Sequence, residues 1–297
     1  MTISQLKRQL VSTRLVLFFV LLVFIRTLVV EPMQTAVEEV RVKVQEDSSG
    51  DSSQNYDSED IPDDRISFFQ PFVSLGNSGM VSLLLPLFFL VMISGLPSSE
   101  KVDMFVHIRT DRLRWIVSQI LTVFFLALGF TLLIVLASGL LTGSCMSFDL
   151  KYCESVTRYN YFFPDKRGEY VLELIPPNLY NQFSFGSALI QSAVLLFSEF
   201  FLLGLILIFF AVLNMKFIGV LAESLGIAIG TILTAAFAKA KWIFTLPHTI
   251  LWLHKDPILK KEPFPMAYSY LYFGGLILLF IILDVVFVKK YESARTQ

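Results

Sequence analysis

The sequence predicts an all-α membrane protein with six transmembrane helices, cytoplasmic N- and C-termini, and a re-entrant or interfacial helix before the last span. Three observations lead to this fold class. The 297-residue chain is 55% hydrophobic and only 16% charged, with a mean hydropathy of +0.65, whereas soluble domains have about 25% charged residues. Six apolar runs approach or exceed the roughly 20 residues that a helix needs to cross a bilayer. Basic residues also gather beside alternate ends of these runs.

The apolar runs are continuous, which favours helices over the alternating strands of a membrane barrel. The first run follows Lys7 and Arg8 as a signal peptide would, but no A-x-A-like cleavage site follows it, so we expect a retained span. We place the six spans at Leu10–Val30, Phe72–Leu96, Trp115–Leu141, Gly186–Leu213, Phe217–Phe237 and Tyr268–Val288.

Charges beside the spans set the expected orientation. Lys7, Arg8 and Arg14 precede the first span and acidic residues follow it, which predicts a cytoplasmic N-terminus. Six crossings return the C-terminus to the same side, where Lys289 and Lys290 agree with this placement.

One external segment, 238–267, carries five lysines and so disagrees with this pattern. Its apolar centre, Trp242–Leu253, contains Pro247 and is too short to span. We therefore expect a re-entrant or interfacial helix there. A seventh crossing is the alternative, and it would place the C-terminal lysines outside.

The chain is expected to be a single polytopic membrane domain, 1–297. Its segments outside the spans are an acidic extracytoplasmic segment 31–70, a cytoplasmic loop 97–114, an extracytoplasmic cap 142–185 and the segment 238–267. Segment 31–70 has eleven acidic and three basic residues, a charge of -8, which leaves +7 for the rest of the chain. Glu31–Gln45 could form a short helix or strand, whereas Glu46–Asp64 has too few apolar residues to fold and is predicted to be disordered. A solubilising spacer and a site for a cationic peptide or divalent cation both fit this stretch.

Both cysteines, Cys145 and Cys153, fall in the predicted external cap. An extracytoplasmic setting permits a disulfide between them, and two unpaired thiols are the alternative. No histidine lies near them, so they offer no metal set.

Four charged residues interrupt the apolar runs: Arg26, Glu199, Glu223 and Asp284. Arg26 and Asp284 lie near span ends, where a long or interfacial side chain can reach the surface. Glu199 lies near the middle of the fourth run, where a carboxylate usually faces a partner or an aqueous path. It is therefore our candidate for the substrate path, and a structural hydrogen bond inside the bundle is the alternative.

Small residues and one proline mark two further spans. Ala222, Gly226 and Gly230 recur every four residues in the fifth span, a pattern that lets helix backbones approach closely, either within the subunit or across a dimer. Pro86 interrupts the second span and is expected to kink it, so we add it to the candidate path.

The sequence contains no catalytic constellation. It has no G-x-x-x-x-G-K-[ST], no H-E-x-x-H and no G-x-S-x-G, and its three histidines lie far apart. We therefore expect neither enzymatic activity, nor a bound metal, nor a cofactor on this chain. No basic stripe with interleaved aromatic residues predicts a nucleic-acid partner.

The inner loop and the spacing of the spans together resemble a known transporter family. The loop reads PSSEKVDMFVHIRTDRLRW, a tight turn at Asn214–Lys216 joins the fourth and fifth runs, and Trp242–Leu253 precedes the last span. Across the whole chain this pattern resembles the permease subunits of ABC-2 type exporters. The long acidic first loop and the short segment before the first span depart from the usual members. The loop positions that carry the resemblance are Glu100, Phe105, Arg109, Arg112, Arg114 and Trp115.

This resemblance implies an ATP-driven exporter of the cell membrane. A second permease copy or a homologous permease would complete the path, and a separate ABC ATPase subunit would bind ATP and Mg²⁺ and dock on loop 97–114. The competing interpretation is a polytopic membrane sensor, binding or immunity protein that holds a peptide with its external segments.

Overall fold

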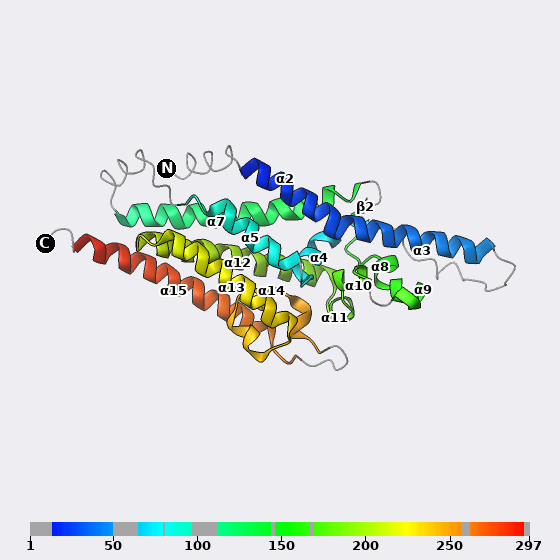
Figure 1. Cartoon of the computed structure of the whole chain (residues 1–297). Coiled ribbons are helices and arrows are strands. Elements are labelled where there is room, and N and C mark those ends of the chain that lie inside the picture. The colour runs from blue at the N-terminus through cyan, green and yellow to red at the C-terminus, as the bar shows by residue number, and fades with distance from the viewer. Residues whose placement is uncertain are drawn as a thin grey trace.

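Long helices run side by side along one axis in this computed structural model (Figure 1). The structure describes residues 14–49, 65–79, 81–96, 112–143, 146–166, 169–256 and 262–293. The long elements are α2 (Arg14–Ile25), the π-helical turn η1 (Arg26–Val30), α3 (Glu31–Ser49), α5 (Val81–Ile93), α7 (Arg112–Leu140), α12 (Phe185–Val212), α13 (Lys216–Ala235) and α15 (Met266–Ser293).

Within these ranges, five helices are long and apolar enough to cross a membrane. A sixth crossing is counted if α4 (Gln70–Asn77) and α5, which meet at 90°, form one broken span. The prediction of a helical, multi-span membrane protein is therefore confirmed. The break in the second span follows Asn77 and does not fall at Pro86, which lies inside α5.

The first helix extends well beyond the expected end of its span. Instead of stopping at Val30, the chain stays helical through η1 and α3 as far as Ser49. The reason is an apolar stripe on α3 at helical spacing, formed by Met33, Ala36, Val37 and Val40, all buried. This stripe packs against α8, α9 and α10, so tertiary contacts hold the helix outside the bundle.

Those short helices form a small lobe at one end of the bundle (Figure 1). The lobe contains α8 (Glu154–Thr157), α9 (Tyr159–Phe162), the 3-10 turn η3 (Pro164–Lys166), α10 (Val171–Leu174) and α11 (Pro177–Tyr180). A two-residue parallel pair connects it to the bundle, with β1 (Ile66–Ser67) beside β2 (Met146–Ser147).

The region before the last span is not one short helix but three turns: η4 (Lys239–Ile243), α14 (Leu246–Thr249) and η5 (Leu251–His254). We call residues 239–254 the three-turn loop. Pro247 occupies the first turn of α14, where its missing N–H costs nothing. The loop packs against α12 and α13, and η5 also contacts α11.

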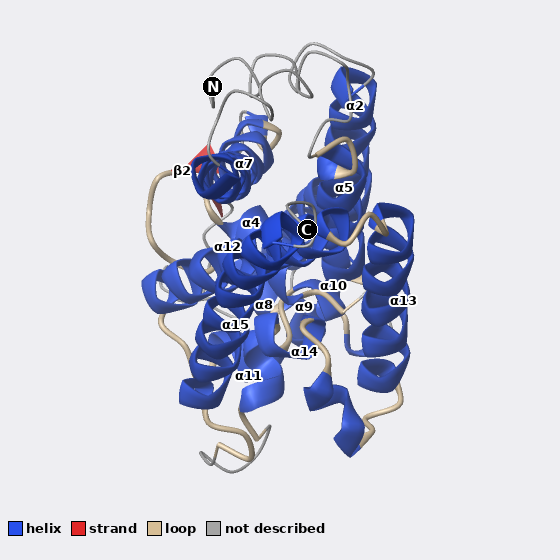
Figure 2. Cartoon of the chain, turned by 90° about the vertical axis from the view of Figure 1, so that its left-hand side faces the viewer, coloured by secondary structure: helices blue, strands red, loops and turns tan. Residues whose placement is uncertain are grey.

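Helix α12 is the central element, because it packs against α4, α5, α7, α13 and α15. Figure 2 shows the bundle from the end at which α7 begins and α15 ends. Aromatic rings fill its middle: Phe200 of α12 stacks on Phe89 of α5 at 4.9 Å and meets Phe130 of α7 edge-on at 5.1 Å. Further along, Gly204 lets α7 approach so closely that an added Cβ would lie 2.0 Å from Val123 Cγ1.

Two residues with positive φ end α12 and α13. Asn214, at φ 62°, ends α12, and the amide of Met215 returns to the carbonyl of Phe210. Phe237, at φ 52°, ends α13 in the same way, with Ala238 bonded to Leu233. This bond pattern is the Schellman C-cap. It explains why the turn between α12 and α13 is as tight as the sequence suggested.

Candidate functional site

Glu199 lies at the middle of α12, fully shielded from solvent. Its Oε1 accepts a hydrogen bond of 3.0 Å from the Thr245 hydroxyl, which belongs to the three-turn loop. Its Oε2 has no hydrogen-bond partner among the described residues. Glu199 is therefore a carboxyl group with one satisfied oxygen and one spare oxygen, held at the contact between the central helix and the loop.

Asn77, the last residue of α4, forms a second link to the same loop. Its Oδ1 accepts from the backbone amide of Leu251 at 2.8 Å, and its own carbonyl accepts from Trp252 Nε1 at 2.7 Å. Its Nδ2 donates to Ser192 Oγ of α12 at 3.0 Å and to the Val73 carbonyl at 2.8 Å. All the hydrogen-bonding groups of this buried side chain are thus used to join α4, α12 and the loop.

These two links connect the three-turn loop, which supplies Thr245 beside Glu199, to the end of α4 where the second span is broken. Helix α4 ends at Asn77 because Ser78 is extended, and the freed end of the helix is where the loop attaches. Pro86 is buried in α5, one helical turn before the Phe89 ring that stacks on Phe200. Pro86 and Glu199 therefore lie on neighbouring helices, α5 and α12, which pack against each other.

The other charges in the spans divide into two kinds. Arg26 is exposed, and its Nη1 donates to the Leu141 carbonyl at 2.7 Å, which caps the end of α7. Asp284 differs from the sequence interpretation: it is fully buried, so it does not reach the surface as expected at a span end. Its carboxylate oxygens, like those of Glu223, have no hydrogen-bond partner among the described residues.

The small-residue face of α13 is covered by other described residues at only part of its length. A Cβ added at Gly230 would lie 2.9 Å from Cβ of Phe244, so the three-turn loop already covers that position. Gly226 has nothing within 4 Å of such a Cβ, and Ala222 is exposed. Close helix approaches occur at two other glycines: an added Cβ would lie 2.7 Å from Phe210 Cβ at Gly219 of α13, and 2.0 Å from Val123 Cγ1 at Gly204 of α12.

Some of the predicted loop and cysteine residues lie outside the residues that the structure describes. Glu100, Phe105 and Arg109 of the inner loop are not described, while Arg112 begins α7 and Arg114 is exposed on its first turn. Cys145 is also outside the described residues. Cys153 is buried at the start of α8, where its amide donates to Gln70 Oε1 at 2.8 Å.

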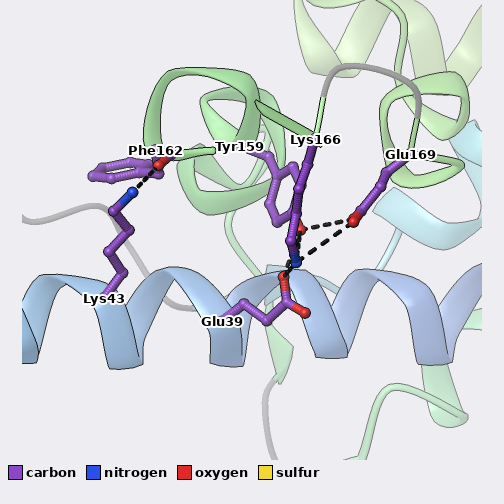
Figure 3. A network of polar contacts seen from close by, with 6 residues as sticks. All are labelled: Glu39, Lys43, Tyr159, Phe162, Lys166 and Glu169. Carbon is purple, nitrogen blue, oxygen red and sulfur yellow. Dashed lines mark hydrogen bonds and ion pairs between the residues drawn. The ribbon is translucent and has the colours of Figure 1, made fainter. Parts of the chain in front are cut away.

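A polar network outside the bundle was not anticipated from the sequence (Figure 3). Lys166 Nζ lies 2.8 Å from Glu39 Oε2 of α3, 3.3 Å from the Tyr159 hydroxyl and 3.4 Å from Glu169 Oε1. The Tyr159 hydroxyl also contacts Glu39 and lies 2.8 Å from Glu169 Oε2. Hydrogen bonding to Glu39 raises the pKa of Lys166, and burial, followed by the carboxylates, raises the pKa of Tyr159. Both groups therefore keep their protons at neutral pH.

Beside this network is an open cavity of about 520 Å³. One wall is a helical stripe of α3 and the other is the turn after α9. Lys43 donates to the Phe162 carbonyl, and its Nζ lies 4.7 Å from the Phe163 ring centre. The cavity is lined by Glu38, Glu39, Val42, Lys43, Glu46, Phe163 and Lys166.

The chain matches no family model, no curated protein and no solved structure. Among the described residues, no group of three or more His, Cys, Asp or Glu side chains could hold a metal ion.

Proposed function

We propose that this chain is the membrane-spanning permease subunit of an ATP-driven exporter of the ABC-2 type, with a substrate path beside Glu199. The observation that carries this proposal is the buried, half-satisfied carboxyl of Glu199 in the central helix. A carboxyl group at this depth is costly in a purely structural role and typically marks a path for a polar substrate or ion.

The arrangement of the helices supports the proposal in a second way. Counting the broken pair α4–α5 as one span, the crossings alternate in direction, so that α2 runs away from, and α15 runs toward, the same end of the bundle (Figure 1). We assign that end to the cytoplasm. The lobe with α8–α11 and the three-turn loop then lie outside, where residues 238–267 form a re-entrant segment and Cys145 and Cys153 can form a disulfide.

Energy must enter from a separate ABC ATPase subunit, because no P-loop occurs in the chain. We assign docking to loop 97–114, the longest segment between spans at the cytoplasmic end. A second permease copy, or a homologous permease, would complete the path, and the cell membrane surrounds both. The open face of α13 at Ala222 and Gly226 is a candidate contact between copies.

The deciding experiment is co-purification of the tagged chain with the P-loop ATPases expressed in the same cells. An associated ATPase whose hydrolysis rate changes with candidate substrates is the expected result. A chain that purifies alone under conditions that preserve a known ABC exporter would contradict the proposal.

A second function, peptide binding by a non-transporting membrane protein, is favoured by the external cavity. Both of its lysines already contact protein groups, whereas Glu38 forms no hydrogen bond or ion pair with another described residue. The remaining capacity of the cavity is therefore for hydrogen-bond donors, which suits a cationic peptide. Binding of a lysine-rich peptide that is lost in Glu38→Gln, without any associated ATPase, would favour this function over export.

A further inference from the structure

Two histidines of the three-turn loop share one serine hydroxyl. His248 Nδ1 lies 2.8 Å from Ser269 Oγ of α15, and His254 Nε2 lies 3.4 Å from the same oxygen. The opposite ring nitrogens face backbone carbonyls: His248 Nε2 lies 2.9 Å from the Trp242 oxygen and His254 Nδ1 lies 2.9 Å from the Phe264 oxygen. The result is a continuous chain of hydrogen bonds between two carbonyl groups.

This series of hydrogen bonds has one proton fewer than it could hold. A carbonyl oxygen only accepts, so each ring nitrogen that faces one must carry a hydrogen. With both imidazoles neutral, His248 Nδ1 and His254 Nε2 are then both acceptors, and the single hydroxyl hydrogen of Ser269 can serve only one of them. The shorter contact to His248 takes it, so the longer contact to His254 lacks a proton.

The surroundings decide how readily that proton is taken up. His248, His254 and Ser269 are all shielded from solvent. Burial lowers the pKa of His248 to about 4 and lowers the pKa of His254. Aromatic rings also surround the pair: Trp242 stacks on Phe264 at 3.9 Å and lies 5.0 Å from His254.

Four other ionisable groups lie around the hydrogen-bonded His254, Ser269 and His248. Lys241 of η4 disfavours a charge on His254, and Glu262, just before α15, favours it. Tyr272 of α15 stacks on His248 at 4.1 Å, and Glu199 of α12 interacts electrostatically with this tyrosine. Because none of these groups forms an ion pair with either imidazole, burial without a counter-charge is the dominant influence.

We propose that the His254–Ser269–His248 chain is a one-proton switch that loosens the three-turn loop from the bundle on acidification. The direction of the pH dependence follows from the difference in proton affinity between the loosened and the packed loop. An imidazole released to water has a pKa of about 6.5, so the loosened loop binds a proton more tightly than the packed loop. Packing is therefore complete above about pH 6.5, and its stability falls as the pH drops from there toward the lowered value of the packed state.

Loosening of the loop also changes the surroundings of Glu199, because the same loop supplies the Thr245 hydroxyl that bonds to it. When the loop loosens, the bond from Thr245 and the bonds from Leu251 and Trp252 to Asn77 are lost together. This inference depends only on contacts within the chain and does not require the proposed ATPase partner.

The test is amide hydrogen exchange of residues 239–254 in the full-length protein in lipid nanodiscs, at pH 7.5 and pH 5.0, after correction for intrinsic exchange rates. We expect at least tenfold less protection of this segment at pH 5.0 in the wild type. His254→Gln removes one of the two titrating rings but keeps an amide that can bond to Phe264 or Ser269, so it should lose less protection at pH 5.0 than the wild type. The double variant with His248→Gln and His254→Gln has no titrating ring left in the chain of hydrogen bonds, so its protection is expected to be the same at both pH values. His107→Gln, at the remaining histidine of the sequence, is the matched control and should respond as the wild type does.

A measurement without substitution covers the case in which His254→Gln fails to fold. Exchange of the imidazole Cε1 hydrogen in the wild type reports the titration of each histidine separately. We expect His248 and His254 to titrate below pH 6.5, with the first proton on His254. Independent titration of both rings at the ordinary value, or equal protection of the wild-type loop at both pH values, would overturn the switch.

Discussion

The side chain of Asn77 accepts a hydrogen bond from the backbone amide of Leu251, 174 positions further along the chain. This bond joins the end of α4 to the three-turn loop, and the same asparagine also bonds to Ser192 of α12. One short polar side chain therefore fixes three elements at the point where the second span is broken. Neither Asn77 nor Leu251 belongs to a sequence motif that would have indicated the contact.

Replacement of Asn77 by alanine should lower the stability of the protein. It removes the side-chain oxygen that accepts from the buried amide of Leu251 and the amide that donates to Ser192, whereas the bond from Trp252 to the backbone carbonyl of residue 77 is kept. Each buried donor left unpaired costs about 1–3 kcal/mol. Thermal unfolding in detergent should show a clearly lower Tm. Asn160→Ala is the matched control, because Asn160 is exposed on α9. An unchanged Tm in Asn77→Ala would show that water or rearrangement replaces these bonds.

Gly204→Ala should disturb the contact between α12 and α7. The added methyl group would lie 2.0 Å from Val123 Cγ1, and overpacking of this kind typically costs about 1–3 kcal/mol. Gly226→Ala is the control, since nothing lies within 4 Å of a Cβ there and alanine favours a helix. The Tm should fall in the first variant and stay equal or rise in the second.

Val123→Ala combined with Gly204→Ala provides the reciprocal test. Removing the two methyl groups of Val123 makes room for the new one, so the double variant should be more stable than Gly204→Ala alone. A double variant that is less stable still would indicate that the destabilisation arises elsewhere in the bundle.

Glu199→Gln should separate the charge of this residue from its shape. The amide fills the same space and can still accept from Thr245, so the Tm in detergent should change by only a few degrees. If Glu199 lines the substrate path, the ATP hydrolysis rate of the complex should no longer respond to substrate. Thr245→Val removes the single hydrogen bond and leaves the carboxyl group in place. A normal substrate response in Glu199→Gln would assign the residue to packing alone.

The sequence predicted the helical runs well because long apolar stretches are a local signal. Each of the six expected spans overlaps a described helix or the broken pair, and the turn at Asn214 fell where it was expected. The extension of α3 and the network around Glu39, Tyr159 and Lys166 depend instead on residues that meet only in the folded chain.

The candidate site illustrates the same limit. The sequence identified Glu199, because a carboxylate stands out in an apolar run. It could not identify Thr245, Asn77 or Ser269 as partners, since threonine, asparagine and serine are common in loops and helices and carry no signal of burial. The three histidines were treated as lying far apart, although His248 and His254 are only six positions from each other, and in the folded chain these two meet at one hydroxyl.

The two cysteines yield a prediction about sidedness as well as about covalent structure. If the lobe is extracytoplasmic, Cys145 and Cys153 should form a disulfide that closes a short loop and stabilises the lobe by roughly 2–3 kcal/mol. Mass analysis of the intact protein under non-reducing conditions should find no free thiol. Two alkylatable thiols in protein prepared without reductant would reject the bridge and weaken the proposed orientation.

The last prediction concerns the docking of the ATPase on loop 97–114. The sequence places Val102, Phe105, Val106 and Ile108 at near-helical spacing, with Arg109 and Arg112 following them. An aromatic side chain buried at an interface typically costs 2 kcal/mol or more on truncation, which corresponds to a loss of affinity of about thirtyfold. Phe105→Ala should therefore reduce recovery of the ATPase in a pull-down while the permease remains folded in the membrane.

Arg109→Ala provides the comparison within the same loop. If the loop only orients the chain on anionic lipid, Phe105→Ala should have no effect and the arginine should matter more, because basic side chains carry that attraction. Equal recovery of the ATPase with the wild type and Phe105→Ala would reject this docking site. Loss of the ATPase in Phe105→Ala alone would place the contact on the aromatic ring, as expected for a side chain inserted into a groove of the partner.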